Sequence, residues 1–351
     1  MNEANEPVTL ATIAAVVGVH VSTVSRVLRS PAPHTETSQR IIEIAEELGY
    51  TPHPAAAALR TRTSRLIGVL LPRVTDFVPA RTYEGIDEAA FTAGYTTVIA
   101  QSGDDPTQRL DRLRALMSLR VDGIIVLDAR ARDDQILKEI TRRDVPYVLA
   151  LRRARGFLSV TSNDIRGGAL AAGHLDDLGH EQIGVVAGPQ YLSTGEERLE
   201  GFASELRKRG RDLPLHRIVS SDFHVSAGLH SARRLLALEP QLTAIFAAND
   251  DAAVGVMGAL RELDLRPGID VSVVGYNDVP YAAHLPVPLT SVSSPMFEIG
   301  KAAADLLIRK LSSADRLRSV RLLPHLVARE STMPVNRERR AGPSQGAVIR
   351  E

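Results

Sequence analysis

From Leu66 onward, short runs of aliphatic and β-branched residues alternate with segments of helical periodicity. The expected strands are residues 67–71, 96–100, 122–127, 146–150, 183–187, 244–247 and 272–276. The helical patterns cover residues 82–94, 107–119, 133–143, 166–178, 197–209, 226–238 and 250–263. Alternation of this kind predicts parallel sheets with helices on both faces.

These units are too many for one compact sheet of common size, so we expect two similar α/β lobes. The chain is expected to pass between the lobes near residues 163–164 and again near residues 291–295. A last helix over 297–311 and a strand over 320–328 would then return it to the lobes.

Residues 8–50 show helical spacing of apolar residues in three segments. Gly18 separates the first two segments and permits the positive φ that a tight corner between helices requires. The third segment runs from about Glu36 to Leu48, with Thr35 as its N-cap and Gly49 as its stop. The expected buried residues are Leu10, Ile13, Ala14, Val17, Val24, Val27, Leu28, Ile41, Ile42, Ile44, Ala45 and Leu48. The residues left on more exposed faces are Val21, Ser22, Ser25, Arg26 and Arg29.

The helix pair in residues 8–28 has two interpretations on these residues alone. Its second helix carries small polar residues and Arg26, which suits a helix that reads a DNA groove. An ordinary αα-hairpin of a helical domain would show the same spacing. Net charge does not distinguish these two interpretations, because 42 basic residues balance 42 acidic ones. Contact with a nucleic acid would therefore depend on where the arginines lie.

Residues 51–65, TPHPAAAALRTRTSR, connect the two regions. Pro52 and Pro54 break the third helix, and residues 55–59 can form one further turn. So short a helix is not stable alone in water, so we expect a hinge here. The expected organisation is a helix-turn-helix domain over 8–50, a hinge over 51–65, a core over 66–334 and a disordered tail over 335–351.

Several classes of protein are disfavoured by what the sequence lacks. Without cysteine there is no disulfide, thiolate metal site or cysteine nucleophile. No P-loop, G-x-G-x-x-G after a strand, G-x-S-x-G or metal-spaced histidine pair occurs, so neither an enzyme nor a cofactor or metal is expected. Residues 1–7 do not resemble a signal peptide, and no apolar run approaches ~18 residues. A cytoplasmic protein without a membrane partner is expected, rather than a secreted sugar receptor.

Motifs spread along the chain together resemble the LacI/GalR family of transcription regulators. In the N-terminal part they are VTLATIAAVVGVHVSTVSRVL (8–28), EELGYTP (46–52) and RLIGVLLP (65–72). In the C-terminal part they are LGHEQIGVVAGP (178–189), ERLEGF (197–202), TAIFAANDDAAVG (243–255) and DVSVVGYNDVP (270–280). The resemblance covers about residues 8–330 in unbroken order.

This resemblance implies an all-α helix-turn-helix headpiece with a hinge helix, followed by an α/β two-lobed core similar to periplasmic binding proteins. It further implies a repressor that binds a pseudo-palindromic operator in double-stranded DNA as a homodimer. A small effector, a sugar or sugar derivative, would bind between the lobes. No leucine heptad follows residue 330, which favours a dimer over a tetramer.

The resemblance also assigns DNA contacts to particular residues. Val21 and Ser22 match the variable positions that touch bases, and Arg26 matches an arginine that donates twice to guanine. Leu59 matches the hinge leucine that wedges into the minor groove, and Ala56 the small residue between paired hinge helices. The expected phosphate contacts are Thr9, Thr23, Ser25 and Thr37.

In this fold a ligand lies at the carboxyl ends of the strands. By resemblance, Arg198 is the cleft arginine, Asn249 and Asn277 are polar cleft positions, and Phe223 covers a sugar or base ring. Further candidates from the first lobe are Phe77, Asp128 and Arg152. For each of these residues the alternative is a structural role at the end of a strand.

The chain departs from the family pattern at both sites. His20 replaces a serine N-cap, His53 replaces the usual asparagine, and Arg29 stands where asparagine is common. In the core, Asn277 stands where aspartate is usual, and Arg152 and Arg153 follow a strand where an acidic residue can appear. These core departures favour an anionic effector, such as a sugar phosphate or sugar acid, over a neutral sugar.

Overall fold

The computed structural model describes residues 8–28, 35–50, 63–103, 105–132, 134–312 and 316–335. The chain divides into two compact units, Met1–Ser64 and Arg65–Glu351. The expectations for Arg29, His53, Ala56 and Leu59, and for the tail beyond Val335, lie outside the described residues.

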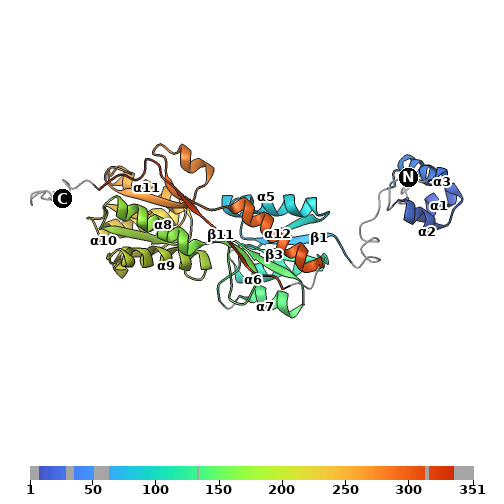
Figure 1. The fold of residues 1–351 in the computed structure, drawn as a ribbon, viewed down its shortest axis with the longest axis horizontal. Helices are drawn as coiled ribbons and strands as arrows, with labels where there is room; N and C mark the ends of the chain where they lie inside the picture. Colours follow the sequence, from blue (N-terminus) through green and yellow to red (C-terminus); the bar gives the residue numbers. More distant parts are fainter. Residues whose placement is uncertain are drawn as a thin grey trace, which may run out of the picture. The chain divides into compact units, whose positions relative to one another are not determined.

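The first unit contains the three expected helices, α1 (Leu10–Val17), α2 (Val21–Val27) and α3 (Glu36–Glu47) (Figure 1). Ile13, Val24 and Ile41, one from each helix, are fully enclosed at its centre. Gly18 adopts φ 76° and donates its N–H to the carbonyl of Ala14, so it forms the predicted corner. Leu48 is 37% exposed, against the expectation, because α3 ends one residue before it.

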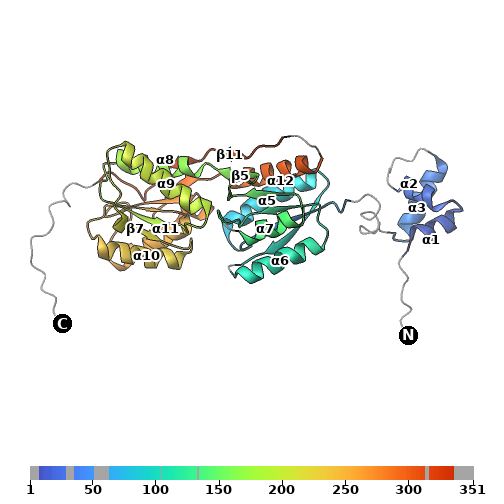
Figure 2. The same ribbon diagram turned by 90° about the horizontal axis from the view of Figure 1, so that it is seen from below.

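The second unit consists of two lobes, each built on a six-stranded sheet (Figure 1). The sheet of lobe 1 has the all-parallel order β11-β5-β4-β3-β1-β2. Its strands are β1 (Leu66–Leu71), β2 (Thr96–Gln101), β3 (Gly123–Val126), β4 (Tyr147–Ala150), β5 (Ser159–Ser162) and β11 (Val320–Leu322). The helices α5 (Phe77–Thr92) and α12 (Met296–Ser312) cover one face (Figure 2). The other face is covered by α6 (Pro106–Ser118) and α7 (Gln135–Arg142).

Lobe 2 repeats this arrangement, with the order β12-β10-β9-β8-β6-β7 and β12 antiparallel to β10. Its strands are β6 (Ile183–Ala187), β7 (Ile218–Ser220), β8 (Ala244–Ala247), β9 (Ser272–Asn277), β10 (Thr290–Ser293) and β12 (His325–Val327). Its α-helices are α8 (Asp164–Asp177) and α9 (Ser193–Lys208) on one face, and α10 (Val225–Leu238) and α11 (Asp250–Glu262) on the other. Two 3₁₀ turns are η1 (Leu215–Arg217) and η2 (Pro280–His284).

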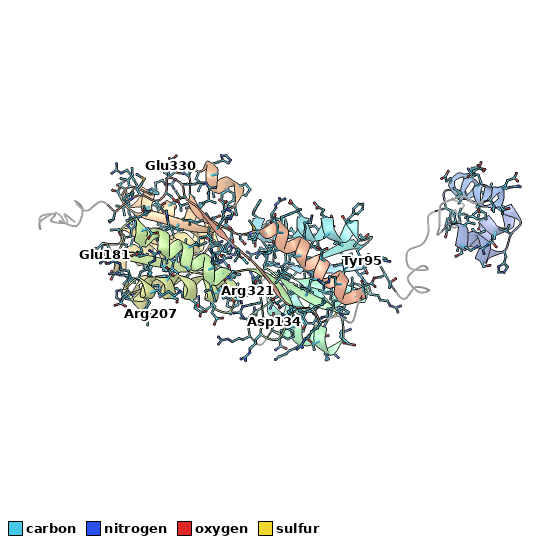
Figure 3. All side chains as sticks on the ribbon, viewed as in Figure 1. Tyr95, Asp134, Glu181, Arg207, Arg321 and Glu330 are labelled. Carbon is cyan, nitrogen blue, oxygen red and sulfur yellow. The ribbon has the colours of Figure 1, made fainter. Side chains whose placement is uncertain are left out.

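The structure corrects the expected path of the chain in two respects. The strands β5, β7 and β10 were not predicted, and the expected strand over 320–328 is two strands, β11 and β12, separated at residues 323–324. Because β11 joins lobe 1 and β12 joins lobe 2, the chain passes between the lobes three times rather than twice. Figure 3 labels Arg321 of β11 at this connection.

No single described helix is long and apolar enough to cross a membrane. The pair α1 and α2 meets that test of length and composition only when the two are joined across a bend of 105°.

Two glycines allow α5 and α12 to pack in close contact. A Cβ atom placed on Gly300 would lie 2.0 Å from the carbonyl oxygen of Thr82, and one on Gly85 would lie 2.0 Å from that of Phe297. Both obstacles are backbone atoms, which cannot rotate away. The seam between these helices therefore depends on the absence of side chains.

We expect Gly300→Ala to destabilise the core by about 1–3 kcal/mol, because the helices must separate to admit the methyl group. The matched control is Gly258→Ala in α11, where the nearest atom to the new Cβ is a leucine methyl at 3.4 Å. The control is expected to be neutral or stabilising, since alanine favours helix more than glycine by about 1 kcal/mol. Thermal unfolding of both variants measures the difference, and equal melting temperatures would contradict the close-packing argument.

Candidate functional site

A cavity of about 180 Å³ lies between the lobes, where the carboxyl ends of strands from both sheets meet. The predicted effector-binding residues that line it are Phe77, Asp128, Arg152, Arg198, Phe223, Asn249 and Asn277. All seven expected positions thus line one space, although they come from helices, strand ends and loops that are far apart in the sequence. That these residues bind an effector stays a prediction.

Arg198, on α9, is the most extensively bonded side chain of the cavity wall. Its Nε donates to Asp164 Oδ1 at 2.9 Å, and its Nη1 donates to the carbonyl of Ala248 at 2.6 Å. Its Nη2 donates to Asn277 Oδ1 at 3.3 Å, and its guanidinium lies over the ring of Tyr276 at 3.7 Å from the centroid. The arginine therefore joins the start of α8 to the ends of β8 and β9 while only 6% exposed.

The contact with Arg198 fixes the orientation of the Asn277 amide. Because a guanidinium can only donate, the amide oxygen must face Arg198. The amide nitrogen of Asn277 then faces away from the arginine as a donor, where aspartate would offer a second acceptor. Asn277 also holds a φ of 107°, a left-handed conformation that side chains rarely adopt. This wall of the cavity consequently presents donors to a ligand.

Asn249 supports Phe223 as well as the helix that follows it. Its Oδ1 accepts the N–H of Ala252 at 3.1 Å as the N-cap of α11, and its Nδ2 donates to the carbonyl of Phe223 at 2.8 Å. Phe223 has a φ of 64°, and this hydrogen bond holds its strained backbone in place. The structural alternative considered for Asn249 is thus present, with one amide hydrogen left for the cavity.

On the lobe 1 side, Asp128 is 4% exposed and lies at the end of β3. Its Oδ2 accepts hydrogen bonds from the hydroxyl of Ser102 and from Arg109 Nε, the latter at 3.0 Å. Its Oδ1 is buried and has no hydrogen-bond partner among the described residues, and the same holds for Ser162 Oγ at the end of β5. Both residues line the cavity, and unsatisfied buried oxygens of this kind call for a ligand or water.

Asp250, the first residue of α11, lines the cavity at 1% exposure. Its two oxygens accept from Ser291 Oγ at 2.6 Å and from the N–H of Val279 at 2.8 Å. Burial raises the pKa of this carboxyl to about 7, although these two hydrogen bonds act to lower it. Asp250 therefore changes its charge near neutral pH.

Several interactions join the lobes directly around the cavity. Glu197 on α9 is 2% exposed and accepts hydrogen bonds from Arg153 and from Arg321 of lobe 1, the latter at 3.3 Å. Burial raises the pKa of Glu197, while the two arginines lower it. Elsewhere Arg73 Nη1 lies 2.8 Å from His224 Nε2. The lobes are thus held together at more than one edge.

The structure corrects one expectation for the headpiece surface, since Ser25 is 8% exposed and belongs to the inner side of α2. The candidates that it leaves exposed are Thr9, Val21, Ser22, Arg26 and Thr37, with Thr23 half-buried. His20 serves as the N-cap of α2, because its Nδ1 accepts the N–H of Ser22 at 3.3 Å. The unusual histidine thus performs the capping role of the serine that it replaces.

Sequence reasoning missed Arg109, Asp164 and Asp250, which hold the cavity together. Asp164 and Asp250 each follow a strand closely and could have been found as polar residues at carboxyl ends of strands. Arg109 lies in a helix among other charged residues and carries no such signal. Within the described residues, no group of three His, Asp or Glu side chains is arranged to hold a metal ion.

Comparison with known proteins gives matches to both parts of the chain. A family model described as bacterial regulatory proteins, lacI family, matches residues 9–53, and a periplasmic binding protein-like domain matches residues 172–332. The ribose operon repressor of Escherichia coli (strain K12) is 32% identical over 332 residues, covering 92% of this chain and 99% of the relative. The chain belongs to the lacI family.

Solved structures of lacI-family regulators agree with this assignment. A lac repressor dimer bound to operator and the anti-inducer ONPF superposes with a TM-score of 0.84 at 28% identity, covering 93% of this chain and 100% of that one. A complex of the transcriptional regulator CelR with cellobiose gives 0.72 at 30% identity, covering 92% and 99%. Like its relatives, this lacI-family chain is a DNA-binding transcriptional regulator with a helix-turn-helix and a two-lobed core.

The carboxyl of Asp250 is expected to make the stability of the core depend on pH. Its pKa is about 7 when folded and near 3.8 when unfolded, so between these values the folded protein holds a proton that the unfolded chain has lost. The free energy of unfolding therefore falls as pH rises from about 4 to about 7, and this contribution is constant above that range.

Asp250→Asn should remove this part of the slope and keep the fold, because an amide can accept from Val279 and donate to Ser291 Oγ. Asp251→Asn, which removes the neighbouring and less enclosed carboxylate, should keep the slope. Urea unfolding at several pH values measures how the free energy of unfolding depends on pH. A pH dependence unchanged in Asp250→Asn would contradict the raised pKa of Asp250.

Proposed function

We propose that this regulator is a homodimeric repressor controlled by a sugar or sugar derivative bound in the cavity between its lobes. The observation that carries this proposal is the pair of buried oxygens without partners in the described chain, Asp128 Oδ1 and Ser162 Oγ. Both residues line a cavity whose wall also includes the amide of Asn277. A ligand with several hydroxyl groups satisfies such a mixed set of donors and acceptors.

The proposed DNA contacts use the exposed face of α2. Val21 is 39% exposed, and Ser22 and Arg26 lie exposed on the same short helix, so all three can reach base edges in a major groove. One headpiece reads few base pairs, so we propose two copies on a pseudo-palindromic operator. Leu59, in the proposed hinge over 51–65, would enter the minor groove.

We further propose that the ligand acts on DNA binding through the angle between the lobes. The three connections and the Glu197 ion pairs give the two lobes a defined arrangement, which a ligand between them would favour or oppose. Such coupling is worth ~1–3 kcal/mol and works in both directions. The role is one of binding rather than catalysis, and operator DNA as a partner implies action in the cytoplasm.

Arg26→Ala is expected to reduce operator affinity by roughly 10- to 100-fold. The reason is that a bidentate contact between arginine and guanine contributes ~1–3 kcal/mol, which the alanine variant loses. The operator is first selected from a random duplex library with the wild-type protein, and affinity is measured by fluorescence anisotropy. The control is Arg40→Ala, which removes the same charge from an exposed position on α3. Unchanged selectivity in Arg26→Ala, or an equal loss in both variants, would reject the base contact.

Arg198→Lys is expected to abolish the response to effector while retaining operator binding. Lysine keeps the charge, but it cannot donate to Asp164, Ala248 and Asn277 in the fixed geometry of a guanidinium. A thermal-shift screen of sugars and sugar acids identifies a ligand, and operator release or retention is then measured with it. A variant that responds to the ligand as the wild type does would contradict the proposed site.

A further inference from the structure

The arginines that line the cavity differ in whether they have a partner. Arg109 is paired with Asp128 at 3.0 Å, and Arg198 with Asp164 at 2.9 Å. Arg73 bonds to His224, and Arg130 lies over the ring of Tyr191 at 5.2 Å from its centroid. Arg152 follows β4, and within the described chain its guanidinium has no hydrogen bond and no ion pair.

The charges around Arg152 do not offset the cost of burying its positive charge. Asp128 and Tyr191 favour its charged form, whereas Arg109 and Arg198, one from each lobe, oppose it. Burial, the largest influence, lowers the pKa of Arg152. For Arg109, by contrast, burial also lowers the pKa, but Asp128 and Asp134 outweigh it and raise the value. Arg152 is thus a partly buried cation that the protein holds without a counter-charge of its own.

We propose that Arg152 binds the carboxylate of a hydroxylated monocarboxylic acid, such as an aldonic or uronic acid, in the cavity. This inference rests on the proposed function and names the chemical class of its ligand. A carboxylate matches the guanidinium with two parallel hydrogen bonds. It also supplies the counter-charge that Arg152 lacks, at a partly buried position.

The surrounding carboxylates select one negative charge rather than two. Asp128 lies near Arg152, and Asp164 and Asp251 line the same cavity. A phosphate monoester carries about −1.5 to −2 charges at neutral pH, so its second charge would lie among these carboxylates and would need Arg73 or Arg130, which also line the cavity, to balance it. The hydroxyl groups of an acid would instead find polar side chains in the wall, among them Asn249 and Asn277.

A first experiment tests the missing counter-charge without any ligand. Arg152→Gln should leave the melting temperature equal to the wild type or raise it, since it removes an unpaired cation from a partly buried position. Arg109→Gln should lower the melting temperature, because it leaves Asp128 and Asp134 buried without their cation. If Arg152→Gln lowers the temperature as much as Arg109→Gln does, Arg152 has a structural partner and the proposal fails.

A second experiment tests the ligand class by calorimetric titration. The probes are D-galacturonate and D-gluconate, their neutral counterparts D-galactose and D-glucitol, and galactose 1-phosphate. We expect an acid to bind the wild type about 10- to 100-fold more tightly than its neutral counterpart, as a charge-assisted pair allows. Arg152→Gln should remove that preference, whereas Arg155→Gln, which removes an exposed charge three residues away, should keep it.

The outcomes separate this inference from the proposed function. Equal affinity for acids and neutral sugars, or an equal loss of both in Arg152→Gln, overturns the carboxylate assignment and leaves the proposed function intact. Tighter binding of the phosphate than of either acid overturns the choice of carboxylate alone. Failure of both acids to bind overturns the inference, and release of operator by any neutral sugar would still support the proposed function.

Discussion

The contacts of Arg198 are the constraint on which the cavity depends. One guanidinium bonds to the carboxylate at the start of α8, the carbonyl that follows β8 and the amide at the end of β9, and it lies on the ring of Tyr276. These contacts set the spacing of three adjacent chain segments and the direction of the Asn277 amide. Because a buried cation is costly unless every donor finds an acceptor, the arrangement leaves little freedom. The shape of the lobe 2 wall follows from it.

Most of the fold could be predicted from the sequence, and the failures at β5, at β10 and at the break between β11 and β12 have a common cause. Strands such as IGVLL and DGIIVL are apolar because both faces of a parallel sheet are covered, so their pattern stands out. The segments SVTS of β5 and TSVS of β10 are almost entirely buried as well, but they are short and three of the four residues in each are polar. Their burial comes from neighbours that are distant in the sequence, which local periodicity cannot show. The break between β11 and β12 has the same origin, since each half pairs with a different sheet.

The site could be predicted as a set of positions but not as a network. Resemblance and strand ends indicated Arg198, Asn277 and Arg152, yet nothing in the sequence distinguishes an arginine that has a carboxylate partner from one that lacks it. That distinction arises because Arg109 reaches Asp128 from a helix nineteen positions away. For Ser25, helical spacing suggested exposure, and only the packing of three helices together decided the question. Pairing and burial are properties of the folded chain, so local sequence does not reveal them.

The late position of α12 and β11 in the chain bears on how the protein forms during synthesis. Five strands of lobe 2, from Ile183 to Ser293, come from one continuous stretch, whereas lobe 1 lacks α12 and β11 until residues 296–322 have been made. Until then the apolar face of α5 around Ile86 and Ala90 has no cover from α12. During synthesis, lobe 1 therefore emerges from the ribosome without two of its elements, and lobe 2 is nearly complete before lobe 1 is. Nascent chains of intermediate length would expose an apolar surface of the kind that chaperones bind.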